Sequence, residues 1–305
     1  MIHIHNGDIT AAMARKAGFA GEHIAFREAL IGGPVREGEE WIAARARFLS
    51  DGHGQDLLRT SNALFEQEQM LAATATHDEV VLWFEHDLFC LIHLLYVLQR
   101  VPAAKTYLVW HDHPIGELKP EEMWRVYQRR GAVTADMIAI AREAWKAYTA
   151  EEPRGLQSLI AKNPREFPFL SDGLALHASR FPSTRTGLGM VDQRILEFIA
   201  EGSLDFEALF NRFSRAQPRF GLGDSEIMRH LRGLASRRVP LVTLLEAAGT
   251  TNAALGITEH GQGVLAGADD IAVNGIDLWL GGVHLTKENL WRWDPATATL
   301  IKGTA

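Results

Sequence analysis

Residues 80–87, Val-Val-Leu-Trp-Phe-Glu-His-Asp, decide the fold, because five apolar side chains run directly into an acid, an imidazole and a second acid. The pattern recurs at residues 106–113, where Thr-Tyr-Leu-Val-Trp precedes His111, Asp112 and His113. A short apolar run of this kind is typical of a strand that is buried on both faces. In open parallel sheets, ligands bind at the carboxyl ends of the strands. Both stretches therefore predict buried strands that carry polar groups to one edge of a sheet.

Strand and helix patterns alternate on either side of these stretches. Strands are predicted at residues 2–5 and 22–27, and helices at residues 10–16, 40–49, 57–73 and 88–98. Such alternation implies a parallel sheet that is covered by helices on both faces. We therefore predict an α/β fold class, with a Rossmann-like parallel sheet as the domain of residues 1–116.

The rest of the chain is predicted to form three further parts. Residues 117–186 read as a helical segment, in which Pro120 suits a first helical turn. Residues 187–270 contain three helical patterns followed by two apolar runs, which is typical of a winged-helix-like domain. Residues 271–305 hold three tryptophans, and we predict a tail that packs back on the body.

Composition narrows the class of protein. The chain has 305 residues and a formal charge of −7, so the chain as a whole gives no basis for non-specific binding to nucleic acid. Cys90 is the single cysteine, which excludes an internal disulfide and a multi-cysteine zinc site. Residues 1–8 do not resemble a signal peptide, and residues 88–98 are too short to span a bilayer. These features predict a cytoplasmic protein with no membrane partner.

Several short motifs resemble a known family. They comprise Asn6-Gly7-Asp8, Arg27-Glu28 with Gly33-Pro34, and the segments 83–87, 144–148, 167–170, 279–282 and 291–293. Together they resemble the bacterial family known as domain of unknown function 1835, over most of the chain. The resemblance supports the α/β fold and implies no chemical role for any residue. That family usually has Arg-Asp after its second strand, where this chain has Arg27-Glu28 with a longer carboxylate.

The predicted sheet edge supplies candidate catalytic and metal-binding residues. The catalytic candidates are Asp8, Glu85, His86 and Asp87. Imidazole and carboxylate groups also bind zinc, iron and manganese, so the candidate metal ligands are His86, Asp87, His111 and His113. Neighbouring strands lie only about 4.8 Å apart, so these groups can meet if their strands are adjacent. Two alternatives stay open: acid–base chemistry by histidine without a metal, or a structural role. In the structural role, Asp87 caps the next helix, and His111 and His113 hydrogen-bond a loop.

The same edge supplies candidate substrate-binding residues, namely Gly7, Thr10, Arg27 and Glu28. A glycine turn before a helix directs backbone N–H groups toward an anion such as phosphate. Arginine binds carboxylate or phosphate with a planar fork of donors. Alternatively, Asp8 or Thr10 caps the helix, and Arg27 pairs with Glu85 or Asp87.

Two functions are compatible with these residues. The first is a metal-assisted hydrolase, in which a divalent metal activates water and Arg27 holds a small phosphorylated or carboxylated substrate. The second is a ligand-sensing regulator whose winged-helix-like domain binds DNA or a partner protein, with Arg229 and Arg232 as nucleic-acid contacts. Residues 189–240 carry eight arginines against seven acids, a net charge of only +1, which is a weak electrostatic footprint for DNA.

Overall fold

A five-stranded sheet forms the centre of the N-terminal half in the computed structural model, which describes residues 1–36, 38, 40–54, 56–202, 204–246, 253–272 and 275–303. The strand order is β2-β1-β3-β4-β5. Four strands are parallel: β1 (Ile2–His5), β2 (Glu22–Ala25), β3 (Val80–Glu85) and β4 (Thr106–His111). The short β5 (Gly131–Ala132) pairs antiparallel with β4. The predicted mixed α/β class is confirmed, and β1, β3 and β4 are neighbours.

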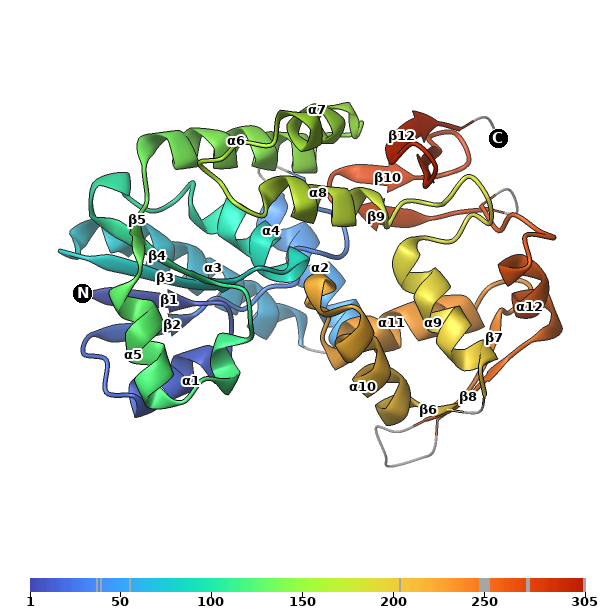
Figure 1. The fold of residues 1–305 in the computed structure, drawn as a ribbon, viewed down its shortest axis with the longest axis horizontal. Helices are drawn as coiled ribbons and strands as arrows, with labels where there is room; N and C mark the ends of the chain where they lie inside the picture. The colour runs from blue at the N-terminus through green and yellow to red at the C-terminus, as the bar shows by residue number, and fades with distance from the viewer. Residues whose placement is uncertain are drawn as a thin grey trace.

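The alternation of side chains along β3 divides the core between the two faces of the sheet. Val81 and Trp83 face a cluster that includes Ala14 and Met123, from α1 (Asp8–Lys16) and α5 (Pro120–Gln128). Val80, Leu82 and Phe84 face the larger cluster formed with α4 (Leu88–Val97) and α6 (Ala135–Thr149). All five of these β3 side chains are fully buried. Residues 80–84 are all apolar because helices cover both faces of the sheet at β3 (Figure 1).

Two helices that precede β3 complete the N-terminal half. They are α2 (Trp41–His53) and α3 (Leu57–Ala73), which pack against each other. The alternation of His3 and His5 in the sequence predicts that this face of β1 is exposed at an edge, but both side chains are fully buried in the structure. They stack with His23, at ring-centroid distances of 4.6 and 5.2 Å, and with Trp83 of β3. His3 and His5 therefore lie on the face of the sheet that α1 and α5 cover.

Helices α7 (Arg154–Lys162) and α8 (Leu170–Ala178) follow α6 and lead to a second lobe (Figure 1). That lobe contains α9 (Met190–Ala200), α10 (Phe206–Ala216), α11 (Asp224–Ala235) and α12 (Glu259–Leu265). It also holds an antiparallel sheet of order β6-β8-β7, made of β6 (Leu204–Asp205), β7 (Val242–Glu246) and β8 (Ala253–Ile257). Asp205 caps α10, whereas Asp224 is the first residue of α11 and Gly223 is the capping position there.

The tryptophan-rich tail forms two hairpins that the sequence patterns do not reveal. These are β9 (Leu278–Leu280) with β10 (Val283–Leu285), and β11 (Trp291–Asp294) with β12 (Thr299–Lys302). Trp291 is buried in a cluster with Ala178, the last residue of α8, and Phe181, which lies just after α8. The Val35 N–H donates to the Gly281 carbonyl at 3.0 Å, so the tail also touches the N-terminal half. Among the described residues, no helix combines the length and the apolar character needed to cross a bilayer.

Candidate functional site

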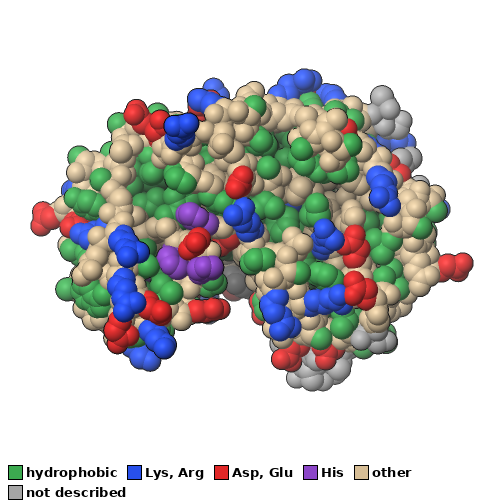
Figure 2. Space-filling model, viewed as in Figure 1, with side chains coloured by type: hydrophobic (Ala, Val, Ile, Leu, Met, Phe, Trp, Pro, Cys, Tyr) green, Lys and Arg blue, Asp and Glu red, His purple; other side chains and the backbone are tan. Residues whose placement is uncertain are grey.

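The carboxyl ends of β1 and β3 meet where the strand order reverses. The chain places β2 on one side of β1 and β3 on the other. In open α/β sheets a crevice for ligands forms at such a reversal. Here Asn6, Gly7 and Asp8 follow β1, while Glu85 ends β3 and Asp87 follows it. In Figure 1 these strand ends point toward the C-terminal lobe, and Figure 2 shows histidine and acidic side chains gathered beside the hollow between the two halves.

Glu85, Asp87 and Cys90 form a compact group at this edge. One ligand atom from each lies within 4.8 Å of the others, and no second such group of three occurs in the part of the chain that the structure describes. Asp87 caps α4, since its Oδ1 accepts the Cys90 N–H at 2.7 Å. Glu85 Oε1 accepts the Ile115 N–H at 2.8 Å. The two carboxylates are thus fixed in place by backbone donors.

Burial changes the acidity of all three groups. It raises the pKa of Asp87 to about 7, and the nearby Glu85 carboxylate adds to the rise against the opposing Cys90 N–H. Burial also raises the pKa of Glu85. The Cys90 thiol is fully buried, and its pKa lies well above the usual value, so it stays protonated. Cys90 is therefore a thiol of the core, and Asp87 is poised to exchange a proton near neutral pH.

A chain of hydrogen bonds behind this group links Asn6 to His93. Leu30 N–H donates to His93 Nε2 at 3.4 Å, so the neutral ring carries its proton on Nδ1. His93 Nδ1 then donates to Asn6 Oδ1 at 2.6 Å, and Asn6 Nδ2 donates to Cys90 Sγ at 2.7 Å. Burial lowers the pKa of His93 to about 3. Sequence reasoning missed Asn6 and His93, although one histidine inside an otherwise apolar helix was a usable sign of a buried polar contact.

Asp8 and Arg27 form an exposed fork at the rim of the edge. Arg27 Nε and Nη2 donate to the two Asp8 oxygens at 2.8 and 2.5 Å, and the side chains are 71% and 64% exposed. The hydrogen bond to Arg27 holds the pKa of Asp8 below its usual value. Gly7, without a side chain, is the capping position of α1. The expected alternatives, in which Asp8 caps the helix or Arg27 pairs with Glu85 or Asp87, are therefore wrong.

The other candidate substrate residues divide between the edge and the core. Gly7 has φ +111°, and a Cβ built there meets no atom within 4 Å, so the space beside it is open. Thr10 is buried in α1. Glu28 is 3% exposed and accepts from Arg45 Nη2 at 2.6 Å and from Arg45 Nε at 3.1 Å. Of Arg27 and Glu28, only Arg27 is therefore available to bind a ligand at the edge.

The candidate metal ligands His86, Asp87, His111 and His113 are near each other but do not form one ligand set in the described ranges. The His86 ring packs between Trp110 and Phe169, with centroid distances of 4.8 and 5.6 Å. His111 Nδ1 lies 2.9 Å from the His113 carbonyl and 3.2 Å from the His113 N–H. Asp87 caps α4. The helix cap and the loop hydrogen bond of the structural alternative are thus present for Asp87 and His111, whereas the His113 side chain is 76% exposed.

The proposed recognition helix, α11, faces partly inward. The Arg229 guanidinium lies 5.5 Å from the centre of the Phe48 ring. Burial lowers its pKa, and a Cβ on Gly32 would stand 2.7 Å from its Nη2. Arg232 lies on the exposed surface. The Arg229 side chain thus lies against the N-terminal half of the chain, whereas Arg232 is exposed.

The edge combines an open anion position, a fork of arginine donors and a carboxyl group that titrates near neutrality. No protein-family model matches the chain, and no curated protein is detectably similar to it. The chemistry of the edge therefore rests on the geometry described above. That geometry suits binding of a small anion with proton transfer beside it.

Proposed function

We propose that the N-terminal half is a Rossmann-like unit, that residues 187–270 form a winged-helix-like unit, and that the chain is related to the domain of unknown function 1835 family. The reversal of strand order between β1 and β3 supports the first assignment. The sequence of three helices α9, α10 and α11 before the β7–β8 hairpin supports the second. The short motifs quoted above support the third.

We propose further that the protein is an enzyme that hydrolyses a small phosphorylated or carboxylated compound at the carboxyl edge of this sheet. One observation carries the proposal. At the reversal point between β1 and β3, the buried carboxyl group of Asp87 and the half-buried one of Glu85 lie together, and the exposed Arg27 fork lies on the same edge. An acid pair that is largely shielded from solvent, beside a cationic anchor, is the arrangement that proton transfer on an anionic substrate needs.

Each residue has a role in this proposal. Asp87, with a pKa raised to about 7, exchanges the proton with water or the leaving group. In the metal form of the proposal, Glu85 and Asp87, rather than the histidines, would supply the oxygen ligands of a divalent cation that lowers the pKa of a bound water, and Asp87 would then be ionised and would not carry the proton. Arg27 releases Asp8 and binds the anionic group of the substrate, since both side chains are mostly exposed to solvent. Gly7 leaves room for that group beside α1.

A hydrolysis assay with elemental analysis tests the proposal. Protein purified without added metal is analysed for bound metal and assayed on a panel of phosphate monoesters and carboxylic esters. We expect activity that falls at least 100-fold in Asp87→Asn, which keeps the cap acceptor but cannot ionise. Asp112→Asn, at an exposed acid on the neighbouring loop, is the control and should retain activity. If no compound of the panel is hydrolysed, the proposal that the protein is a hydrolase is wrong. If the protein is active without stoichiometric metal, the proposal that a metal assists the reaction is wrong.

The alternative regulator keeps one supporting observation, which is the helical lobe itself with Arg232 exposed on α11. A gel shift with random duplex DNA at low and high salt tests it. Binding that Arg232→Glu abolishes would favour the regulator. Unchanged binding in that variant would exclude α11 as the DNA-contacting helix.

A further inference from the structure

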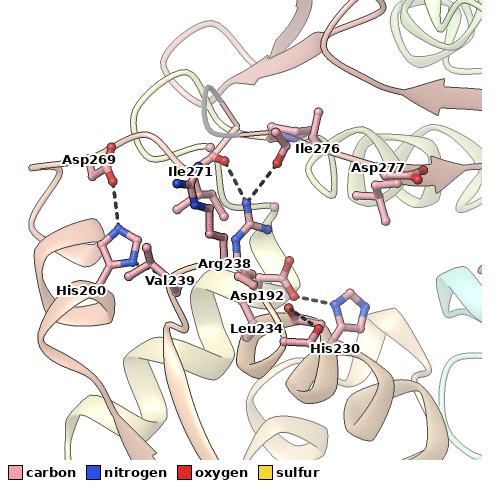
Figure 3. A pocket seen from close by; sticks show the side chains of 18 of the residues that line it. Asp192, His230, Leu234, Arg238, Val239, His260, Asp269, Ile271, Ile276 and Asp277 are labelled. Atoms are coloured by element: carbon pink, nitrogen blue, oxygen red, sulfur yellow. Dashed lines mark hydrogen bonds and ion pairs between the residues drawn. The ribbon is translucent and has the colours of Figure 1, made fainter.

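A large cavity lies in the C-terminal lobe, away from the sheet edge. Its volume is about 720 Å³, and it is bounded by α9, α11 and the start of α12 on one side and by the chain before β9 on the other (Figure 3). Arg237 joins the two walls, because its Nη2 donates to the Ile271 carbonyl at 2.9 Å. Cavities of roughly 300–1,000 Å³ are the usual size for small-molecule sites. The space is therefore large enough for an organic molecule.

Three arginines that line this cavity, Arg180, Arg229 and Arg238, form no ion pair with the residues that the structure describes. Arg180 is 5% exposed; its Nη1 donates to the Ile31 carbonyl at 2.8 Å, while its buried Nε has no hydrogen-bond acceptor among the described residues. Arg229 and Arg238 also form no ion pair and no hydrogen bond with the described part of the chain. A buried guanidinium whose N–H groups lack an acceptor is costly, and an anion in the cavity would offset that cost by accepting from Arg180 and Arg229 directly.

The acids of the cavity wall are already paired with histidines. Asp192 accepts from His230 Nδ1 at 2.6 Å, and Asp269 accepts from His260 Nε2 at 2.9 Å, as Figure 3 shows. Asp277 pairs with His284 at 2.7 Å. These pairs hold the carboxylates in place, although Asp192 and the buried Glu226 still act on Arg180 and Arg229 through their charges. Four arginines and three aspartates line the cavity, so its wall carries an excess of positive charge that suits an anion.

Apolar side chains form the remainder of the wall. They include Leu234, Val239, Ile271, Ile276 and Leu278. We propose that this cavity binds a small organic molecule that carries a phosphate or carboxylate group, with the anionic group at Arg180 and Arg229 and the organic part against these apolar side chains. Arginine forks suit both kinds of anion. The site is separate from the sheet edge, so the proposal does not depend on the enzyme proposed above.

Calorimetric titration of the full chain tests the proposal with three matched probes. Phenyl phosphate and benzoate carry the two anionic groups, and benzyl alcohol is a neutral compound of similar size. We expect at least one anion to bind with a Kd below about 1 mM. Benzyl alcohol should bind at least tenfold more weakly. Comparison of the two anions tells whether phosphate or carboxylate is preferred.

Two variants locate the binding. Arg229→Met should weaken the better anion at least tenfold. Gly233→Leu should do the same by filling the cavity, since a Cβ at Gly233 meets no atom within 4 Å and the helix tolerates it. Gly52→Leu in α2 is the matched control, at another helical glycine with open space, and should bind normally. Binding is read only from variants with the wild-type unfolding transition.

Three results would overturn the proposal. The first is that neither anion binds below about 10 mM. The second is that binding survives both Arg229→Met and Gly233→Leu, because the anion would then occupy another place. The third is that Arg27→Ala, rather than the cavity variants, abolishes binding, which would assign the anion to the sheet edge.

Discussion

Gly221 of the C-terminal lobe lies directly against the carboxylate of Asp87 at the end of β3. A Cβ on Gly221 would stand 2.2 Å from Asp87 Oδ1 and 3.0 Å from the Phe89 Cβ. Gly221 also has φ +64°, a left-handed conformation that favours glycine. The second lobe therefore covers Asp87, and this contact explains why Asp87 is only 9% exposed although it lies at a sheet edge.

Replacing Gly221 by alanine should destabilise the protein more than its backbone conformation alone requires. The left-handed φ costs about 1 kcal/mol for any L-residue, and the clash with Asp87 should add about 1–3 kcal/mol. Gly54→Ala is the matched control, with φ +62° and no atom within 4 Å of a built Cβ. Chemical denaturation of both variants measures the difference. Equal losses in the two variants would mean that the lobe can move off Asp87 without cost.

The titration of Asp87 should appear in the pH dependence of stability. Its folded pKa of about 7 lies above the unfolded value of about 3.9. The folded state therefore binds the proton more tightly, and Asp87 makes stability fall as the pH rises from 4 to 7. Asp87→Asn should remove this loss, by up to about 1.4 kcal/mol per pH unit in that window. Unfolding curves at pH 4, 5.5, 7 and 8 test this, with Asp112→Asn as control. A gain that does not grow with pH would contradict the raised pKa.

The strands of the sheet could be predicted from the sequence because each carries its own pattern. Residues 80–84 and 106–110 are apolar throughout, and they form β3 and β4. The contents of the site could not be predicted in the same way. Whether Arg27 reaches Asp8 or Glu85 depends on strand order and side-chain direction, and neither is encoded in local spacing. The structure pairs it with Asp8 across β1 and β2.

His177 gives a second pH-dependent prediction, of opposite sign. It is fully buried against Tyr148 and Phe181, and neither ring nitrogen has a hydrogen-bond partner among the described residues. Burial holds its pKa well below the usual 6.5. Below about pH 6.5, His177 therefore binds a proton in the unfolded chain but not in the folded chain. The free energy of unfolding falls as the pH falls through this range.

His177→Leu should raise the free energy of unfolding by about 1–3 kcal/mol, because an unsatisfied buried polar group is removed. It should also flatten the loss of stability between pH 6.5 and 5. His113→Gln, at a side chain that is 76% exposed, is the control and should change neither quantity. Thermal unfolding across this pH range measures both. A destabilised variant with an unchanged pH slope would show that the imidazole makes a contact that leucine cannot replace.

The tail illustrates what sequence patterns leave out. Its strands are three or four residues long, too short for a clear alternation. They are held by contacts with distant segments, such as Val35 with Gly281. The tryptophans predicted a tail packed on the body, and Trp291 is buried, but the sequence patterns did not predict the pairing of the tail into two hairpins.

Two arginine forks of the same geometry should contribute very differently to stability. Arg45 and Arg27 each donate Nε and Nη2 to a carboxylate, of Glu28 and Asp8 respectively. The Arg45 pair is 0% and 3% exposed, and Arg45 also donates to the Gly32 and Pro34 carbonyls at 2.7 and 3.1 Å. Breaking a buried pair costs about 3–5 kcal/mol, since a charge is left without a partner.

Arg45→Lys should therefore destabilise the protein by at least about 2 kcal/mol, because an ammonium cannot reproduce five donors in a fixed fork. Arg27→Lys should change stability by less than about 1 kcal/mol, since its pair is mostly exposed and screened by solvent. Chemical denaturation of the two variants measures the loss of unfolding free energy for the same substitution at a buried and at an exposed arginine. If Arg27→Lys proved equally costly, Arg27 would be a structural anchor of β2, and its assignment to an anionic substrate would lose its support.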